Sequence, residues 1–292
     1  MSKHAEITPQ LPIGLYEQVL DDELARTLKS LERSGGLQAV TAPLDPGDSH
    51  DVLARYLAGR IARALRAEAE KPGGDEAARM TRQVALCNRL LALSEPESEA
   101  ALLPPEPAAR LMAIRHAGGD AAAARPTTPL SASCLLTGAR RDPTLLSQLK
   151  AEIATADRVD MLCSFIKWSG VRVLAGELRT LAETRARPLR LVTTSYTGAT
   201  DQRAVDFLRD LPGAQVRVSY DTKRTRLHAK AYLFHRDSGF GTAYIGSSNL
   251  SDPAMTDGLE WNVKISQYES PHLWAKIVAT FDAYWNDDSE FA

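Results

Sequence analysis

The alternation of predicted helices and strands in the second half of the chain constrains its fold most strongly. Residues 159–166 form a continuous apolar run, which is typical of a strand covered on both faces. Amphipathic patterns and short apolar runs then follow one another along the chain. The expected helices cover 143–156, 170–185, 201–211 and 272–285, and the further expected strands cover 189–196, 216–220, 227–234, 242–245 and 259–265. This alternation predicts an α/β layered domain whose functional site lies at strand ends.

The first third of the chain instead predicts a small helical domain. Apolar residues recur there at helical spacing in four segments, 14–33, 51–71, 75–93 and 106–116. Asp75 stands where the third of these helices requires an N-cap. Residues 118–130 are rich in Gly, Ala and Pro, which is typical of a linker. We therefore predict a helical domain at 1–117, a linker at 118–130 and a catalytic domain at 131–292.

Composition sets limits on the partners. The 292 residues carry a net charge of only -2, so any surface that binds nucleic acid must be local. The three cysteines, Cys87, Cys134 and Cys163, show no metal-ligand spacing, which favours a reducing compartment over a disulfide framework. No apolar run reaches membrane-spanning length, and the N-terminus lacks the apolar stretch of a signal peptide. We expect a cytoplasmic protein with no membrane partner, no metal and no cofactor.

The densest cluster of chemically useful residues lies near the C-terminal end. In the strand expected at 227–234, period-two alternation places His228 and Lys230 side by side on one face. The turn Gly246-Ser247-Ser248-Asn249 follows the next expected strand, and Glu260 opens the one after it. An imidazole, an ammonium group, an amide-and-hydroxyl turn and a carboxylate are therefore expected to converge at neighbouring strand ends.

This set suffices for phosphodiester cleavage without a metal. A neutral, correctly oriented imidazole can attack phosphorus, and a carboxylate such as Glu260 can orient it. Lys230, Asn249 and Ser247 can hold the non-bridging oxygens, whose charge must be stabilised in the transition state. A second imidazole is then needed to protonate the leaving oxygen. The sequence offers only one obvious candidate in this cluster.

These residues resemble the signature of the phospholipase D superfamily, which is His-x-Lys, a downstream Gly-Ser-x-Asn and, in the nuclease branch, a later acidic residue. The resemblance implies an α/β/α layered domain and a phosphohistidine formed on His228. It also implies phosphate binding by Lys230 and Asn249, and pairing of Glu260 with His228. Many members carry Asp five residues after the Lys, where this chain has His235. The absence of this Asp argues more strongly against a phospholipase than against a nuclease.

A closer resemblance is to the phospholipase-D-like module at the N-terminus of certain bacterial DEAD/DEAH-box helicases. The stretches 189–200 and 225–263 carry it, and the likeness as a whole spans 128–288. It implies a helicase motor as an attached partner. The chain contains no such motor after its last helix, so we expect either a piece of a longer protein or a stand-alone relative.

One copy of the signature is half of an active site. No second His-x-Lys with a downstream Gly-Ser-x-Asn occurs in the first 220 residues. The resemblance implies a two-fold dimer, in which His228 of one chain is the nucleophile and His228 of the other chain is the general acid. We therefore expect a homodimer with one composite cleft.

Further residues are candidates for substrate binding. Lys223, Arg224 and Arg226 directly precede His228, which favours contacts with a nucleic-acid backbone, although plain surface charge is the alternative. Thr194, in a hydroxyl-rich stretch before an expected helix, is a candidate for a flanking phosphate, or part of a simple turn. Ser248, in the Gly-Ser-Ser-Asn turn, is a further candidate.

The leading hypothesis is a metal-independent nuclease that cleaves DNA in defence or repair. A catalytically silent module that binds DNA or targets a helicase is the first alternative. A phospholipase is the second, disfavoured by the single motif and by the absence of an amphipathic membrane-docking helix.

Overall fold

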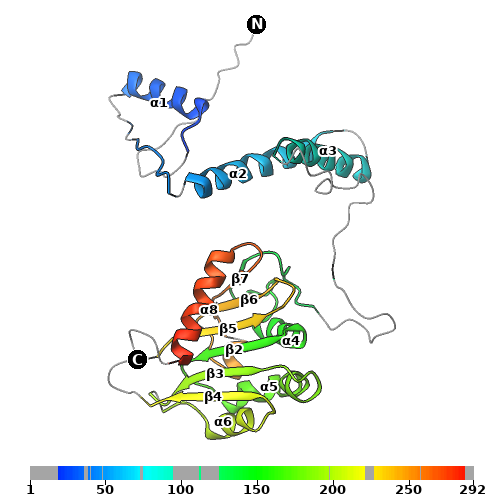
Figure 1. The fold of residues 1–292 in the computed structure, drawn as a ribbon, viewed down its shortest axis with the longest axis vertical. Helices are drawn as coiled ribbons and strands as arrows, with labels where there is room; N and C mark the ends of the chain where they lie inside the picture. Colours follow the sequence, from blue (N-terminus) through cyan, green and yellow to red (C-terminus); the bar gives the residue numbers. More distant parts are fainter. Residues whose placement is uncertain are drawn as a thin grey trace. The chain divides into compact units, whose positions relative to one another are not determined.

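The computed structural model describes residues 19–35, 39, 41–47, 49–72, 75–94, 112, 125–196, 198–220, 227–256 and 258–286 (Figure 1). The chain forms two compact units, Met1–His116 and Ala117–Ala292. Within the described ranges, no helix combines the length and the apolar character needed to cross a bilayer.

The first unit is helical where it is described. It contains α1 (Asp22–Gly35), α2 (Ser49–Glu70) and α3 (Glu76–Ser94). The last two agree with the predicted helices, and Asp75 caps α3 by accepting a hydrogen bond from Ala78 N at 2.9 Å. Gln83 Nε2 on α3 donates to Leu65 O on α2 at 3.1 Å, which ties the two helices together. Of the helix predicted at 106–116, only Met112 belongs to the described residues.

The second unit is built on a seven-stranded mixed sheet. Its strands are β1 (Cys134–Leu136), β2 (Arg158–Cys163), β3 (Leu189–Thr194), β4 (Ala214–Ser219), β5 (Lys230–His235), β6 (Thr242–Gly246) and β7 (Asn262–Ser266). Their order across the sheet is β1-β7-β6-β5-β2-β3-β4. β2, β3 and β4 are parallel to one another, and β5, β6, β7 and β1 each run antiparallel to the neighbour.

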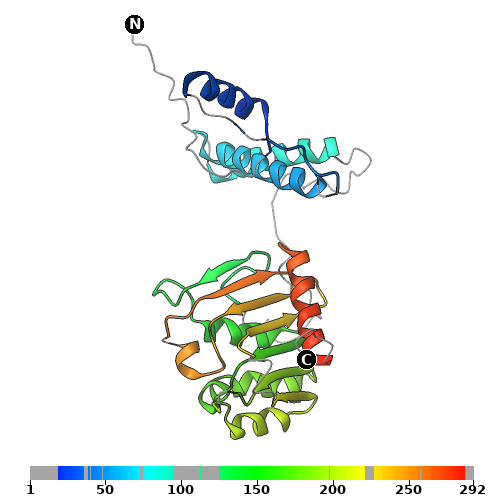
Figure 2. The same cartoon turned by 90° about the vertical axis from the view of Figure 1, so that its left-hand side faces the viewer.

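Helices cover both faces of this sheet, as predicted for an α/β layered domain (Figures 1 and 2). One face packs against α4 (Leu145–Thr155), α5 (Trp168–Arg179) with its π-helical end Thr180–Thr184, and α6 (Gln202–Arg209). The other face packs against α8 (Pro271–Asn286). The predicted alternation in β5 is confirmed, because Ala231 and Leu233 lie in the core under α8 and Tyr232 lies in the opposite core.

Three local features differ from the sequence expectations. The edge strand β1 was not predicted, because three residues are too few to show a period. β5 begins at Lys230 and β7 at Asn262, so His228 and Glu260 both precede their strands. Part of the expected linker also lies on the sheet: the buried ammonium group of Lys264 donates to Thr128 O at 3.2 Å and Pro129 O at 2.6 Å. A buried charge requires such acceptors, which explains why these residues are held.

Strand direction brings the signature residues to one edge of the sheet. β2, β3 and β4 end at this edge, β5 begins there, β6 ends there and β7 begins there. We call it the motif edge. The residues before β5, after β6 and before β7 therefore lie together, although more than thirty residues separate His228 from Glu260 along the chain.

Candidate active site

His228 and Lys230 are in direct contact at the motif edge. The Nζ atom of Lys230 lies 3.0 Å from Nδ1 and 3.1 Å from Nε2 of His228, and it donates to the His228 carbonyl oxygen at 2.7 Å. His228 is exposed, whereas Lys230 is only 5% exposed. Burial lowers the pKa of the Lys230 ammonium, and the electrostatic effects of Cys163 and Glu260 oppose this shift. An accessible imidazole is thus paired with a largely buried cation.

The turn after β6 is packed tightly against the start of β7. A Cβ atom at Gly246 would lie 2.1 Å from the Trp261 carbonyl oxygen, so only glycine fits there. Ser247 is exposed and forms three hydrogen bonds with Trp261. Ser247 N donates to Trp261 O and Trp261 N donates to Ser247 Oγ, both at 3.1 Å, and Ser247 Oγ donates to Trp261 O at 3.4 Å. The hydroxyl group of Ser247 thus lies at the surface of the motif edge.

Ser248 has a supporting position, in contrast to its predicted role as a substrate-binding residue. It is fully buried, its hydroxyl donates to Ala254 O at 3.2 Å, and the same oxygen accepts from Asn262 Nδ2 at 2.8 Å. The Tyr232 hydroxyl donates to the Ser248 carbonyl oxygen at 3.0 Å. These bonds hold the turn in place and leave the Ser248 side chain out of reach of a phosphate.

Asn249 presents one end of its amide group to the site. Its Oδ1 atom accepts hydrogen bonds from Ser164 Oγ at 2.7 Å and Phe165 N at 3.3 Å. Its Nδ2 atom has no hydrogen bond to any described residue and is not among their buried unpaired atoms. The NH₂ group is therefore the part of Asn249 that can donate to a ligand oxygen.

The carboxylate of Glu260 is half-buried near the Lys230 ammonium group. Burial lowers the pKa of Lys230, and the charge of Glu260 opposes part of that shift. Between the two described side chains of Glu260 and His228 there is no hydrogen bond or ion pair, so the pairing implied by the family resemblance is not formed here. The four signature elements nevertheless share the motif edge.

The remaining predicted contacts differ from expectation or lie outside the described residues. Thr194 is fully buried at the end of β3, where its hydroxyl donates to Ser219 O and accepts from Tyr196 N, both at 3.0 Å. It therefore joins β3 to β4 and does not face a phosphate. Lys223, Arg224 and Arg226 lie outside the described residues.

Two residues that the sequence reasoning missed, Ser164 and Tyr232, support this site. Both are fully buried and both bond to the Gly-Ser-Ser-Asn turn. The signal in the sequence was weak: each is a single polar group within or next to an apolar strand. Among the residues that the structure describes, no group of three or more His, Cys, Asp or Glu side chains could hold a metal ion.

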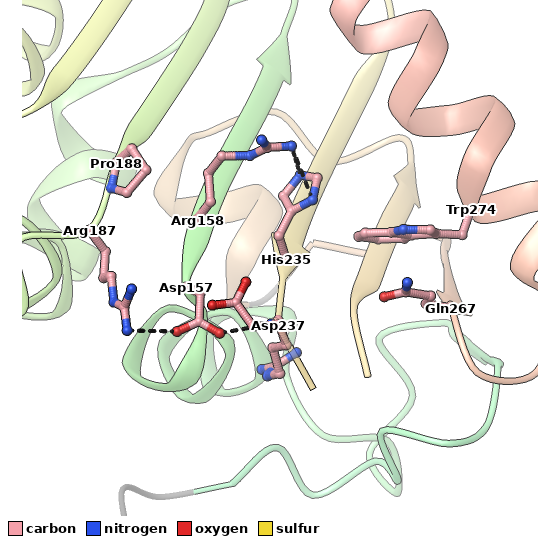
Figure 3. A pocket seen from close by; sticks show the side chains of 9 residues that line it. Asp157, Arg158, Arg187, Pro188, His235, Asp237, Gln267 and Trp274 are labelled. Atoms are coloured by element: carbon pink, nitrogen blue, oxygen red, sulfur yellow. Dashed lines mark hydrogen bonds and ion pairs between the residues drawn. The ribbon is translucent and has the colours of Figure 1, made fainter. Parts of the chain in front are cut away.

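A cavity of about 390 Å³ lies at the opposite edge of the sheet and contains none of the signature residues (Figure 3). Its lining includes Arg158, His235 and Trp274. His235 occupies the position of the family's Asp, and its Nε2 atom lies 2.7 Å from Oδ2 of the buried Asp160. The departure from the family pattern therefore falls at the far end of β5, in a structural network.

A family model and several solved structures are similar to parts of this chain. Residues 149–285 match the family model described as "Cardiolipin synthase, PLD-like domain". Among solved structures, NucT from Helicobacter pylori shares 16% identity over 52% of this chain and 93% of its own, with a TM-score of 0.40. The phospholipase D family member Nuc from Salmonella typhimurium shares 19% identity over 47% of this chain and 84% of its own, with a TM-score of 0.36. No curated protein matches the chain. Residues 149–285 are thus similar to the phospholipase-D-like domain that this family model describes.

Proposed function

We propose that the chain is a metal-independent phosphodiesterase that cleaves the DNA backbone, with His228 as its nucleophile. The observation that carries this proposal is the contact, at 3.0 Å, between the exposed imidazole of His228 and the buried ammonium group of Lys230. The amide NH₂ group of Asn249, which bonds to none of the described residues, and the hydroxyl of Ser247 lie at the same edge of the sheet. An attacking group and donors for the phosphate oxygens would thus lie next to the ends of neighbouring strands.

The proposed reaction has two displacements at phosphorus. A neutral ring nitrogen of His228 attacks, a P–N bond forms, and the P–O bond to the leaving fragment breaks. The leaving oxygen takes a proton from a second imidazole, which then removes a proton from water. This water attacks the phosphohistidine, breaks the P–N bond and releases the second fragment with a terminal phosphate. Lys230 and Asn249 donate to the non-bridging oxygens in both steps.

The second imidazole is proposed to come from a second copy of the chain. In the described part of the second unit, the other histidines, His235 and His272, belong to the opposite edge of the sheet. A two-fold homodimer would place two copies of His228 across one phosphate. Light scattering at micromolar concentration should therefore give twice the chain mass, and a monomer that still cleaves DNA would contradict the composite site.

The biological setting is proposed from the sequence resemblance alone. The likeness of residues 189–200 and 225–263 to helicase-linked modules supports a role in DNA defence or repair. It also supports a helicase motor as the partner of this domain. The basic run Lys223, Arg224 and Arg226 supports DNA as the polyanion that is bound, because phosphate contacts supply most of such affinity.

The test is cleavage of labelled single- and double-stranded DNA by the full chain in EDTA. We expect cleavage that persists in the chelator and is lost in His228→Ala. The matched control is His272→Ala, which removes an exposed histidine at the opposite edge and should leave the rate unchanged. Tight DNA binding without cleavage would favour the silent targeting module, and full activity in His228→Ala would end the proposal.

A further inference from the structure

Ser164 is a fully buried hydroxyl group directly behind the proposed site. It follows the last residue of β2, and its Oγ atom donates to Asn249 Oδ1 at 2.7 Å. Burying a hydroxyl group is unfavourable unless it is hydrogen-bonded, and Asn249 supplies the acceptor. We propose that Ser164 is a positioning residue that, together with the Phe165 N–H group, holds the Asn249 amide in place, so that its NH₂ group faces the phosphate. This inference rests on the proposed function.

The neighbouring backbone defines which end of the amide faces inward. The N–H group of Phe165 can only donate, and it lies 3.3 Å from the same Asn249 atom that Ser164 contacts. That atom must therefore be the carbonyl oxygen, and the Ser164 hydroxyl must donate to it as well. The amide nitrogen then carries the two hydrogens that can be donated to a ligand.

The opposite orientation would be harmful to phosphodiester binding. A rotation of the amide by 180° would place Oδ1 against an anionic phosphate oxygen and would remove two donors. The Phe165 N–H group opposes this rotation, because it can only donate, whereas a hydroxyl group can donate or accept. The Ser164 bond is the shorter of the two and holds the amide against the Phe165 N–H group. Loss of Ser164 should therefore loosen the Asn249 side chain and weaken its preferred orientation without abolishing it.

The backbone of the turn is held by other residues. Tyr232 OH donates to Ser248 O at 3.0 Å, and Lys167 N donates to Leu250 O at 2.8 Å. Neither bond involves Ser164. A change at Ser164 should thus alter the Asn249 side chain while the turn keeps its place, which separates positioning from folding.

The experiment is a double-mutant cycle on the hydrolysis of bis(p-nitrophenyl) phosphate by the full chain. Ser164→Ala should lower kcat by about tenfold, less than the loss caused by Asn249→Ala. In the Asn249→Ala background, Ser164→Ala should change kcat by less than about twofold, because its target is absent. Ser169→Ala is the matched control: Ser169 accepts from Asp252 N at 3.4 Å beside the same turn, and it does not touch Asn249.

Two kinetic results would overturn the inference. One is equal losses from Ser164→Ala in both backgrounds, since this would mean that Ser164 acts independently of Asn249. The other is an unchanged kcat in the single variant. A wild-type chain that hydrolyses no phosphodiester would instead defeat the proposed function, and a measurement without turnover then decides the inference.

That measurement is the nitrogen-15 spectrum of the Asn249 side chain, assigned by its loss in Asn249→Ala. The wild type should give one sharp pair of NH₂ resonances. Ser164→Ala should give doubled or exchange-broadened resonances, because the loosened side chain samples more than one conformation. A single sharp pair in both proteins would overturn the inference, whatever the enzymatic activity.

Discussion

Nζ of Lys230 lies within 3.0 Å of Nδ1 of His228, although Lys230 is buried at the first position of β5 and His228 is exposed two residues earlier. The strand fixes the cation, and the chain just before it carries the imidazole. This arrangement places a positive charge beside the proposed nucleophile at the moment when charge develops on the phosphate oxygens.

Removal of this cation should reduce catalysis strongly. Lys230→Ala is expected to lower kcat on the order of a hundredfold or more, because a preorganised charge at the transferring phosphate is lost. Steady-state kinetics with bis(p-nitrophenyl) phosphate measure this effect. A loss confined to KM would show instead that Lys230 binds the ground state and the transition state equally.

Deprotonation of Lys230 should set the pH above which activity falls. Burial lowers the pKa of Lys230 below its usual 10.5, so the ammonium group should lose its proton at a lower pH than an exposed lysine. The kcat/KM of the wild type should therefore fall as the pH rises through a value below 10.5. Lys230→Arg keeps its charge at high pH and should move this limb upward. An alkaline limb that is identical in both proteins would assign it to another group.

The Gly-Ser-Ser-Asn turn should tolerate no side chain at its first position. A Cβ atom at Gly246 would lie 2.1 Å from Trp261 O, so Gly246→Ala should lower the free energy of unfolding by about 1–3 kcal/mol through overpacking. Gly176 within α5 is the matched control, because a Cβ atom there meets nothing within 4 Å. Gly176→Ala should raise the free energy of unfolding by up to about 1 kcal/mol. Urea unfolding measures both, and equal effects would contradict the packing argument.

The network at the opposite edge of the sheet should stabilise the fold without taking part in catalysis. Asp160 is fully buried and accepts two hydrogen bonds from Arg190, both at 2.7 Å. Burial alone would raise the pKa of Asp160, but the bonds from Arg190 and His235 outweigh it and lower the pKa. Asp160→Asn should therefore cost about 3 kcal/mol of unfolding free energy at neutral pH, while kcat stays close to that of the wild type.

The acid dependence of stability follows from the same shift. The folded pKa of Asp160 lies below its usual 3.8, so its contribution is complete above this value and is lost as the pH falls through the folded pKa. Urea unfolding from pH 7 to pH 2 should show a smaller acid loss in Asp160→Asn than in the wild type. Parallel curves for the two proteins would show that other carboxylates cause the acid loss.

Sequence patterns predicted much of this fold because its long elements have clear periods. The apolar run predicts β2, and the helical period predicts α8. The alternation in β5 predicts that Ala231 and Leu233 lie on one face. The three-residue β1 was not, because it forms only by pairing with β7. Local patterns carry no information about such long-range pairing.

The candidate site was predictable in its residue types but not in its contacts. Spacing along the chain identified His228, Lys230 and Asn249, and strand directions then brought them to one edge. Burial could not be read from spacing, so Thr194 and Ser248 were assigned to substrate although both are fully enclosed. Ser164 was missed because its partner Asn249 lies 85 residues away.

The measurement that tests the central claim most directly is the capture of the covalent intermediate. The wild-type chain is mixed with an end-labelled oligonucleotide, quenched in denaturant at alkaline pH, where a P–N bond survives, and digested for mass spectrometry. The account predicts a nucleotide fragment on the peptide that contains His228, and its absence in His228→Ala. A fragment attached to a different residue, or DNA cleavage by His228→Ala at the wild-type rate, would contradict it.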